Sequence, residues 1–123
     1  MREIVNGANR ATWIAEDDER MTGFAIVEWT EEARSLAAYI QTIEVAPEQR
    51  GRGVGGELLR RMKGSARAAG AETIWLHVDA GNAGAIRLYE AQGFRSVGRE
   101  ENYYPRGRTA IIYSKRLSSG EVG

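Results

Sequence analysis

A glycine-dense segment between a β-like run and an amphipathic helix constrains the fold of this chain more than any other feature. The β-like run ends at Ile43, Glu44 and Val45, and four glycines lie at positions 51, 53, 55 and 56, directly before a helical pattern. Where no Cβ atom intervenes, backbone N–H groups can converge on an anion, and the start of a helix adds partial positive charge. Arg50 and Arg52 add formal charge. The segment therefore predicts a pyrophosphate-binding loop and, with it, a bound cofactor.

Composition narrows the class of protein. With 123 residues, 42% of them hydrophobic and 28% charged, the chain is expected to form one domain over residues 1–117, followed by a frayed tail over residues 118–123. Its 17 basic and 17 acidic side chains balance, so no overall field attracts nucleic acid or an anionic membrane. The chain has no cysteine and a single histidine, His77, which argues against a metal site. It shows neither a membrane-length apolar run nor a signal peptide, so we expect a cytoplasmic location.

Hydrophobic periodicity predicts an α/β fold in which helices cover one mixed sheet, with elements in the order β-β-β-α-β-α-β-β. The predicted strands are 12–15, 21–29, 36–45, 73–78, 94–101 and 109–116, and the predicted helices are 54–69 and 83–92. Turns are expected at 16–20 and 30–33, and a loop at 102–108. In the first helix the apolar residues recur at helical spacing, namely Leu58, Leu59, Met62 and Ala66.

Two other nucleotide-binding loops must be weighed against this one. The glycines at 51, 53 and 56 formally match the dinucleotide fingerprint, but residues 46–50 separate them from the strand and three strands precede them. A Walker A loop is absent, because no Gly-Lys-Ser/Thr occurs. A glycine-rich turn without any ligand is the plain alternative. We favour a ligand, because glycine costs about 0.5–1 kcal/mol where its flexibility is not needed.

The pattern Arg50-x-x-Gly53-x-Gly55, after a strand that ends Ile43-x-Val45, resembles the acyl-CoA loop of the GNAT superfamily of N-acetyltransferases. Residues 75–94 look like the fifth strand and fourth helix of that family. This stretch and the sequence Asn-Tyr-Tyr-Pro at 102–105 look most like the ribosomal-protein alanine N-acetyltransferases within it. The resemblance runs from about residue 12 to residue 117. It implies a mostly antiparallel mixed sheet with a splayed central strand pair and flanking helices.

The resemblance also implies a role for individual residues toward acetyl-CoA. The pantetheine arm would bond to the opened strand edge at Ile43, Glu44 and Val45. The pyrophosphate would lie on the N–H groups of Arg50, Gly51, Arg52, Gly53, Val54, Gly55 and Gly56. Asn82 would contact the cofactor while capping its helix. Tyr89 matches the general acid that protonates the departing CoA thiolate, and its alternative role is core packing.

His77 departs from the family pattern, because the ribosomal-protein enzymes carry a glutamate there that is thought to act as the general base. An ordinary imidazole titrates near ~6.5 and is suited to taking up the proton of an attacking amine. Strand parity places His77 on one face with Trp75 and Asp79. The alternative is an interior histidine whose hydrogen bonds are all made and which takes no part in catalysis. In that case water would carry the proton to Glu44, Asp79 or solvent. Tyr39 shares the parity of Ile43 and is not an obvious base.

By this resemblance, an amine would attack the acetyl group directly in a ternary complex. An α-amine with a pKa near ~8 is roughly a tenth neutral at pH 7, whereas a lysine at ~10.4 is neutral in about one molecule in 2,500. A protein N-terminus is therefore the favoured acceptor. A small-molecule amine and a non-catalytic acetyl-CoA-binding module remain alternatives. Tyr103 and Tyr104 are expected to border the acceptor, and Glu100 and Glu101 either attract a cation or form a solvated turn.

The N-terminus is the second departure from the family pattern. Members normally begin with a strand and two helices that cover the acceptor groove, whereas this chain starts near the second strand. We expect an N-terminally shortened member in which Ile4 and Val5 form a remnant of the first strand. Three explanations for the missing cover stay open: the sequence is truncated, a partner subunit supplies the cover, or the acceptor site is unusually open. Of these we favour a homodimer, for which an exchange of terminal strands is one arrangement.

Overall fold

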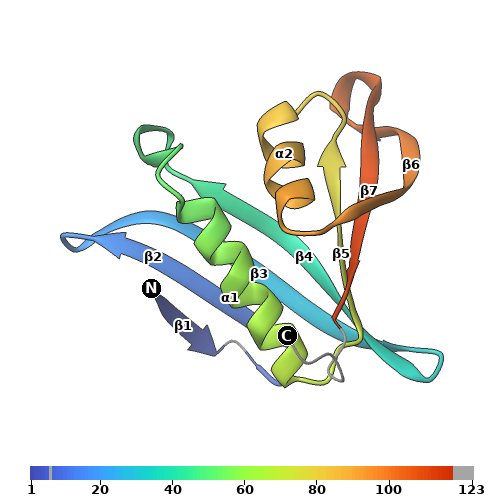
Figure 1. The fold of residues 1–123 in the computed structure, drawn as a ribbon, viewed down its shortest axis with the longest axis horizontal. Coiled ribbons are helices and arrows are strands. Elements are labelled where there is room, and N and C mark those ends of the chain that lie inside the picture. Colours follow the sequence, from blue (N-terminus) through green and yellow to red (C-terminus); the bar gives the residue numbers. More distant parts are fainter. Residues whose placement is uncertain (6, 118–123) are drawn as a thin grey trace.

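The computed structural model describes residues 1–5 and 7–117, so the expected frayed tail lies outside the described residues. Within them, seven strands form one sheet in the order β1-β2-β3-β4-β5-β7-β6 (Figure 1). The elements in chain order are β1 (Arg2–Val5), β2 (Arg10–Asp17), β3 (Arg20–Glu32), β4 (Ser35–Val45), α1 (Val54–Ala68), β5 (Thr73–Asp79), α2 (Ala83–Ala91), β6 (Arg95–Tyr104) and β7 (Arg108–Arg116). Short 3-10 turns occupy Pro47–Gln49 and Pro105–Gly107.

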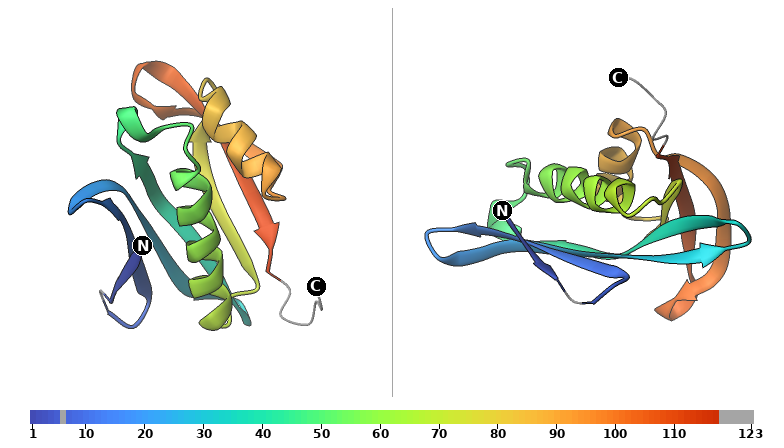
Figure 2. Two further views of the ribbon diagram at one scale, coloured as in Figure 1. Left: turned by 60° about the vertical axis from the view of Figure 1, so that its left-hand side comes forward. Right: turned by 90° about the horizontal axis from the view of Figure 1, so that it is seen from below.

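The sheet is mixed and mostly antiparallel, as predicted. Every neighbouring pair of strands is antiparallel except β4 and β5, which are parallel. Both helices lie over the same face of the sheet, which we call the helical face, and the described residues place no helix on the opposite, open face (Figure 2). The sheet therefore presents one packed surface and one surface available for other contacts.

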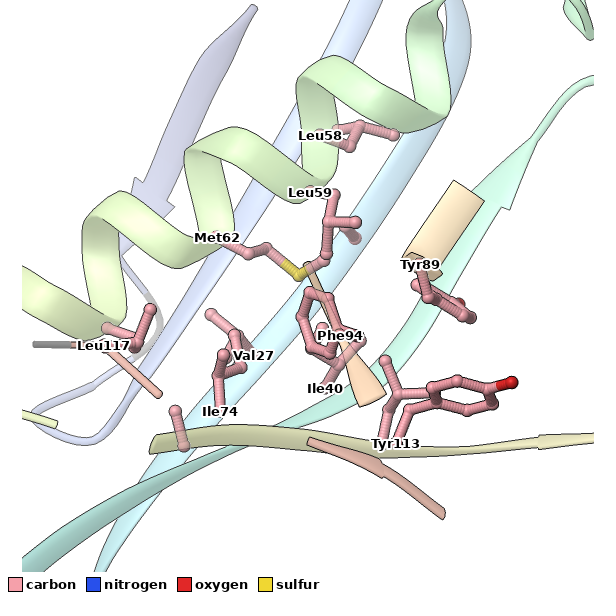
Figure 3. Close-up of a cluster of buried hydrophobic side chains, with 14 of the residues drawn as sticks. Val27, Ile40, Leu58, Leu59, Met62, Ile74, Tyr89, Phe94, Tyr113 and Leu117 are labelled. Atoms are coloured by element: carbon pink, nitrogen blue, oxygen red, sulfur yellow. The ribbon is translucent and has the colours of Figure 1, made fainter. Parts of the chain in front are cut away.

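The core lies between α1 and the helical face of the sheet. The four apolar residues predicted from helical spacing are all fully buried: Leu58, Leu59, Met62 and Ala66. Figure 3 shows Leu59 and Met62 extending from α1 toward Val27 and Ile74 of the sheet. Fully burying one such side chain stabilises the fold by about 1.5–3 kcal/mol. The α1 stripe is therefore the main attachment of the helix layer.

Two of the predicted turns are shorter in the structure. The turn at 16–20 contains only Asp18 and Glu19, whose φ values of 49° and 65° fit the tight turn that matches the twist of a hairpin. The loop at 102–108 shrinks to residues 105–107, because β6 continues to Tyr104 and β7 begins at Arg108. An additional strand, β1, precedes the predicted order. It contains Ile4 and Val5 and pairs with β2, which confirms the expected remnant of a first strand.

The two central strands separate from each other along their length, which confirms the predicted splay. Strands β4 and β5 pair only at Ala37 with Thr73, Ala38 with Ile74 and Tyr39 with Trp75. Beyond this point β4 continues to Val45 and β5 to Asp79 without pairing with each other, while β4 stays paired with β3 and β5 with β7. A β-bulge lies at the start of the separation: adjacent residues of β3 pair with Ile40 and Thr42, so that Gln41 is extra. Bulges bend a strand and increase its twist, which explains why β4 leaves β5 here.

Candidate functional site

The glycine segment forms the left-handed turn that starts α1. Gly51 and Gly53 have φ values of 80° and 84°, a region in which side chains with a Cβ are strained. Gly53 is the N-cap of α1 and provides no side-chain cap, although its carbonyl accepts the N–H of Glu57 at 3.0 Å. The N–H groups of the first helical turn, from Val54 onward, therefore lack an N-cap oxygen and point along the positive end of the helix dipole. This geometry suits an anion, as predicted, and Arg50 and Arg52 lie exposed beside it.

The remaining two glycines have a packing role. A Cβ on Gly55 would lie 3.3 Å from Leu88 of α2, and a Cβ on Gly56 would lie 3.4 Å from Gln92. The side-chain amide of Gln92 also donates to the carbonyl of Gly56 at 3.0 Å. These contacts hold the two helices close together. The cost of the four glycines is therefore no evidence for a ligand, because each position has a conformational or packing reason of its own.

The strand edge predicted to hold the pantetheine arm lies at the opening between β4 and β5. Ile43 and Val45 are half-buried against the core, and Glu44 between them is exposed and accepts from the Thr42 hydroxyl at 2.8 Å. The predicted shared parity of Tyr39 and Ile43 is wrong. The bulge at Gln41 reverses the alternation, so that Ile43 faces the helices whereas Tyr39 lies on the open face.

Tyr89 lies on α2, above the opening on the helical face. Its side chain is buried and its ring packs near Phe94 and Tyr113, with centroid distances of 5.8 and 6.4 Å (Figure 3). Burial, with smaller contributions from Tyr104 and Glu44, raises the pKa of Tyr89 to about 12. The hydroxyl therefore stays protonated at neutral pH and can act as a proton donor. Core packing and an acid role are compatible at this position.

Asn82 caps α2, as predicted from the sequence. Its side-chain oxygen accepts the N–H of Ala85 at 3.2 Å. The neighbouring Asp79 is also engaged, because it accepts from the N–H of Gly81 at 2.8 Å and pairs with Arg108 at 2.7 Å. Asp79 is therefore held at the end of β5 by β7, where it fixes the turn that leads into α2.

His77 lies on the open face, opposite the core-facing residues of β5, as strand parity predicted. Its Nδ1 atom is 2.9 Å from the hydroxyl of Tyr39, and its Nε2 atom is 3.0 Å from a carboxylate oxygen of Glu100. The ring of Tyr103 stacks on the imidazole with a centroid distance of 4.2 Å and an interplanar angle of 7°. The side chain of His77 is only 9% exposed. Both ring nitrogens and one ring face are thus in contact with neighbouring side chains.

Tyr39 is the site residue that sequence reasoning missed. It comes from the last paired position of β4, opposite Trp75, and its ring lies 4.6 Å from that indole. Burial, followed by the neighbouring Tyr103, raises the pKa of Tyr39 above its ordinary value, so its hydroxyl is a donor at neutral pH. Only the register of the parallel pair places Tyr39 beside His77, and the bulge at Gln41 conceals that register in the sequence.

The two glutamates of β6 have different neighbours. Glu100 reaches His77, whereas Glu101 accepts from the hydroxyl of Thr109 at 3.0 Å and lies 3.4 Å from Arg99. The sequence predicts the same role for Glu100 and Glu101, whereas in the structure they have different partners. On the same open face a pocket is lined by Glu28, Thr30, Glu32, Tyr39 and Trp75. The surface that adjoins His77 is therefore aromatic and acidic.

Searches for two other kinds of site found nothing in the described part of the chain. No group of three or more histidine, aspartate or glutamate side chains is arranged to hold a metal ion over residues 1–5 and 7–117. In the same residues no helix is long and apolar enough to cross a membrane.

Comparison with known proteins gives consistent matches. The model of the acetyltransferase (GNAT) family matches residues 1–94. The [ribosomal protein bS18]-alanine N-acetyltransferase of Salmonella typhimurium is 39% identical over 104 residues, which are 82% of this chain and 68% of that enzyme. Streptothricin acetyltransferase of Streptomyces lavendulae is 39% identical over 87 residues, which are 71% of this chain and 45% of that enzyme.

A solved structure supports the same assignment. The crystal structure of the ribosomal-protein-S18-alanine N-acetyltransferase from Escherichia coli superposes with a TM-score of 0.82 at 30% sequence identity. The match covers 94% of this chain and 74% of that one. The similarity therefore extends over nearly the whole of this chain.

Proposed function

This chain belongs to the acetyltransferase (GNAT) family, and we propose that it moves an acetyl group from acetyl-CoA to a protein or peptide N-terminal α-amine. Acetyl-CoA is the cosubstrate. The observation that carries the proposal is the opening between β4 and β5, which has Tyr89 on its helical face and His77 on its open face. A donor that enters from one face and an acceptor that enters from the other would meet between these two side chains.

We propose that acetyl-CoA binds on the helical face. Its pyrophosphate would lie at the start of α1, on the N–H groups after Gly53, and its pantetheine arm would follow the unpaired edge of β4 from Val45. An unpaired strand edge provides backbone donors and acceptors in a row, and an extended ligand can bond to them as a further strand would. Asn82, at the start of α2, would contact the same cofactor.

We propose direct transfer from acetyl-CoA to the acceptor amine. The neutral amine attacks the acetyl carbonyl, a C–N bond forms and the C–S bond breaks. The N–H group near Val45 would stabilise the developing oxyanion. Tyr89 would give its proton to the departing thiolate, a role that its protonated state at neutral pH supports. The chain has no cysteine, so no cysteine acyl-enzyme forms.

We propose that His77 takes the proton of the amine through the hydroxyl of Tyr39. The two ring nitrogens of His77 already have partners, and the phenol is the partner that can both accept a proton and donate one. As the amine proton moves to Tyr39, the phenolic proton moves to Nδ1 of His77. This path assigns a role to Tyr39 and keeps the predicted role of His77.

The acceptor class rests on the named relatives. The Salmonella typhimurium enzyme is named for the alanine of ribosomal protein bS18, and a protein α-amine is far more often neutral at pH 7 than a lysine amine. The Streptomyces lavendulae enzyme is named for streptothricin, which makes a small-molecule amine the second candidate. A non-catalytic acetyl-CoA-binding module is the third. The predicted cytoplasmic location and homodimer stay predictions.

The test measures release of CoA thiol with three acceptors: a peptide with a free N-terminal alanine, the same peptide with a blocked N-terminus and an internal lysine, and streptothricin. We expect turnover with the first and background release with the second, and mass spectrometry should place the acetyl group on the α-amine. Faster turnover of streptothricin would favour the small-molecule reading. Calorimetric binding of acetyl-CoA, with no turnover of any acceptor, would favour the non-catalytic module.

A further inference from the structure

A line of three polar side chains crosses the open face of the sheet from β6 to β4. The carboxylate of Glu100 lies 3.0 Å from Nε2 of His77, and Nδ1 of His77 lies 2.9 Å from the hydroxyl of Tyr39. Three different strands supply the three groups, because Glu100 comes from β6, His77 from β5 and Tyr39 from β4. Glu100 thus lies on the far side of the imidazole from the phenol.

The chemistry of these groups fixes the positions of the protons. A carboxylate accepts hydrogen bonds and donates none, so the Nε2 atom of His77 must carry the hydrogen in the contact with Glu100. A neutral imidazole has one N–H, and its Nδ1 atom is then an acceptor. The hydroxyl of Tyr39 must therefore donate to Nδ1. Without Glu100, either ring nitrogen could carry the proton. In the Nδ1–H tautomer, Nδ1 could not accept a hydrogen bond from Tyr39.

We propose that Glu100 is a positioning residue that holds His77 in the Nε2–H tautomer and stabilises the imidazolium formed during acetyl transfer. This inference rests on the proposed function, because it concerns the proton path of that reaction. The amine proton moves to Tyr39 while the phenolic proton moves to Nδ1. His77 becomes positively charged, its Nε2–H remains bonded to Glu100, and Glu100 stays ionised throughout. Return of the proton from Nδ1 to solvent through Tyr39 restores the starting state.

A β-bulge in β6 creates this arrangement. The register between β6 and β7 shifts between Glu100 and Tyr104, and Asn102 has a φ of 55°. In a regular strand Glu100 and Tyr103, three residues apart, would point to opposite faces. Here both contact His77, Glu100 at the ring edge and Tyr103 across the ring face. The stacked phenol limits rotation of the imidazole, and bulges of this kind occur beside active sites because they redirect a side chain.

The groups that face His77 come from three elements. Tyr39 faces it from β4, Glu100 and Tyr103 face it from β6, and on its own strand it has Trp75 within 5.4 Å between ring centroids. Asp79, the acidic residue two positions along β5, is paired with Arg108. Glu100 is therefore the carboxylate bonded directly to the imidazole in the described structure, and it is the group whose removal should change the tautomer of His77.

The first experiment reads the tautomer without activity. Because His77 is the only histidine of the chain, the nitrogen resonances of its imidazole can be assigned without ambiguity in labelled protein. We expect the Nε2–H form in the wild type and in Glu100→Gln, since the amide oxygen of glutamine can still accept. Glu100→Ala should show a mixture of tautomers. The control is Glu101→Gln, the adjacent carboxylate with other partners, and it should resemble the wild type.

The second experiment measures kcat and the KM for acetyl-CoA in the same variants. We expect Glu100→Ala to lower kcat roughly 10- to 100-fold, with little change in the KM for acetyl-CoA, and Glu100→Gln to lower kcat less. Glu101→Gln should keep the wild-type kcat and KM.

The outcomes separate this inference from the proposed function. If the wild type turns over no amine acceptor, the proposed function fails, while the resonances still test whether Glu100 selects the tautomer. If the wild type is active, and Glu100→Ala keeps the wild-type tautomer and the wild-type kcat, Glu100 has no positioning role and the inference is overturned.

Discussion

The hydroxyl of Tyr39 lies 2.9 Å from Nδ1 of His77, and this contact connects the two central strands just where they separate. The last paired position of the two strands is Tyr39 with Trp75, and His77 is the next residue of β5 on the same face. The contact therefore joins the paired part of the sheet to the opening. In the proposed mechanism, this contact would let a histidine with both ring nitrogens engaged exchange a proton with the acceptor amine.

Removing the base should abolish most turnover. We expect His77→Ala to lower kcat by about 10²–10⁴-fold, the usual contribution of general base catalysis. Tyr39→Phe should lower it in the same direction, because the phenyl ring keeps the packing and loses the proton path. Tyr113→Phe is the matched control, since the Tyr113 hydroxyl bonds to Glu90 instead. Steady-state kinetics checks the rates, and equal rates for Tyr39→Phe and Tyr113→Phe would contradict the proton path.

Tyr89 should act as an acid over the whole physiological range. Burial raises the pKa of Tyr89 to about 12, so the hydroxyl stays protonated up to about pH 11. Between pH 8 and 10, kcat should therefore show no fall that is due to ionisation of Tyr89. Tyr89→Phe should lower kcat by about 10²-fold or more while binding of acetyl-CoA persists. The measurement is kcat against pH together with calorimetric titration. An unchanged kcat in Tyr89→Phe would leave this residue with core packing alone.

The buried tyrosine should also make the fold sensitive to alkali. The pKa of Tyr89 is about 12 in the folded chain and 10.0 in the reference state, so above pH 10 the unfolded chain loses this proton first. The unfolded state then binds fewer protons, and the free energy of unfolding falls as pH rises, by up to about 2–3 kcal/mol between pH 10 and 12. Urea unfolding at several pH values checks this. Tyr89→Phe should show a smaller fall, and an identical fall would contradict it.

The turn before α1 should depend on glycine for its backbone shape. Gly53→Ala places a Cβ at a φ of 84°, which should lower the free energy of unfolding by about 1–2 kcal/mol and weaken acetyl-CoA binding. Gly64→Ala is the control, because Gly64 lies within α1 with open space around it. This substitution should stabilise the fold by about 0.5–1 kcal/mol. Thermal unfolding and calorimetry measure both effects. Equal binding by the two variants would remove the turn from the cofactor site.

The expected homodimer has a direct test. Strands β1 and β6 form the two edges of the sheet and expose unpaired backbone groups. On the open face of the sheet, Phe24 and Trp75 are only half-buried. A second copy that covers these residues would bury them. Sedimentation at micromolar concentration should give twice the 13.6 kDa mass of one chain, and a single monomeric species would end this prediction.

Much of the fold follows from local patterns in the chain. The helical spacing of Leu58 and Met62 gives the buried face of α1, and the alternation through β5 gives the face of His77, because both depend only on the period of the element. The turn at Gly51 and Gly53 is predictable for the same reason, since a positive φ selects glycine from the local backbone alone. The family resemblance added the splay of the central strands, which periodicity does not contain.

The contacts of the proposed proton path, in contrast, were decided by tertiary structure. Tyr39 and Glu100 lie 38 and 23 positions from His77, and they reach it only through the register of four strands, because β7 lies between β5 and β6. A one-residue bulge at Gln41 and a two-residue irregularity around Asn102 change which side chains face His77. A bulge is set by the packing of neighbouring strands and leaves little signal in the sequence of its own strand. The chain by itself therefore determined its elements, its buried helix face and its glycine turn, whereas long-range strand pairing decided which groups contact the imidazole.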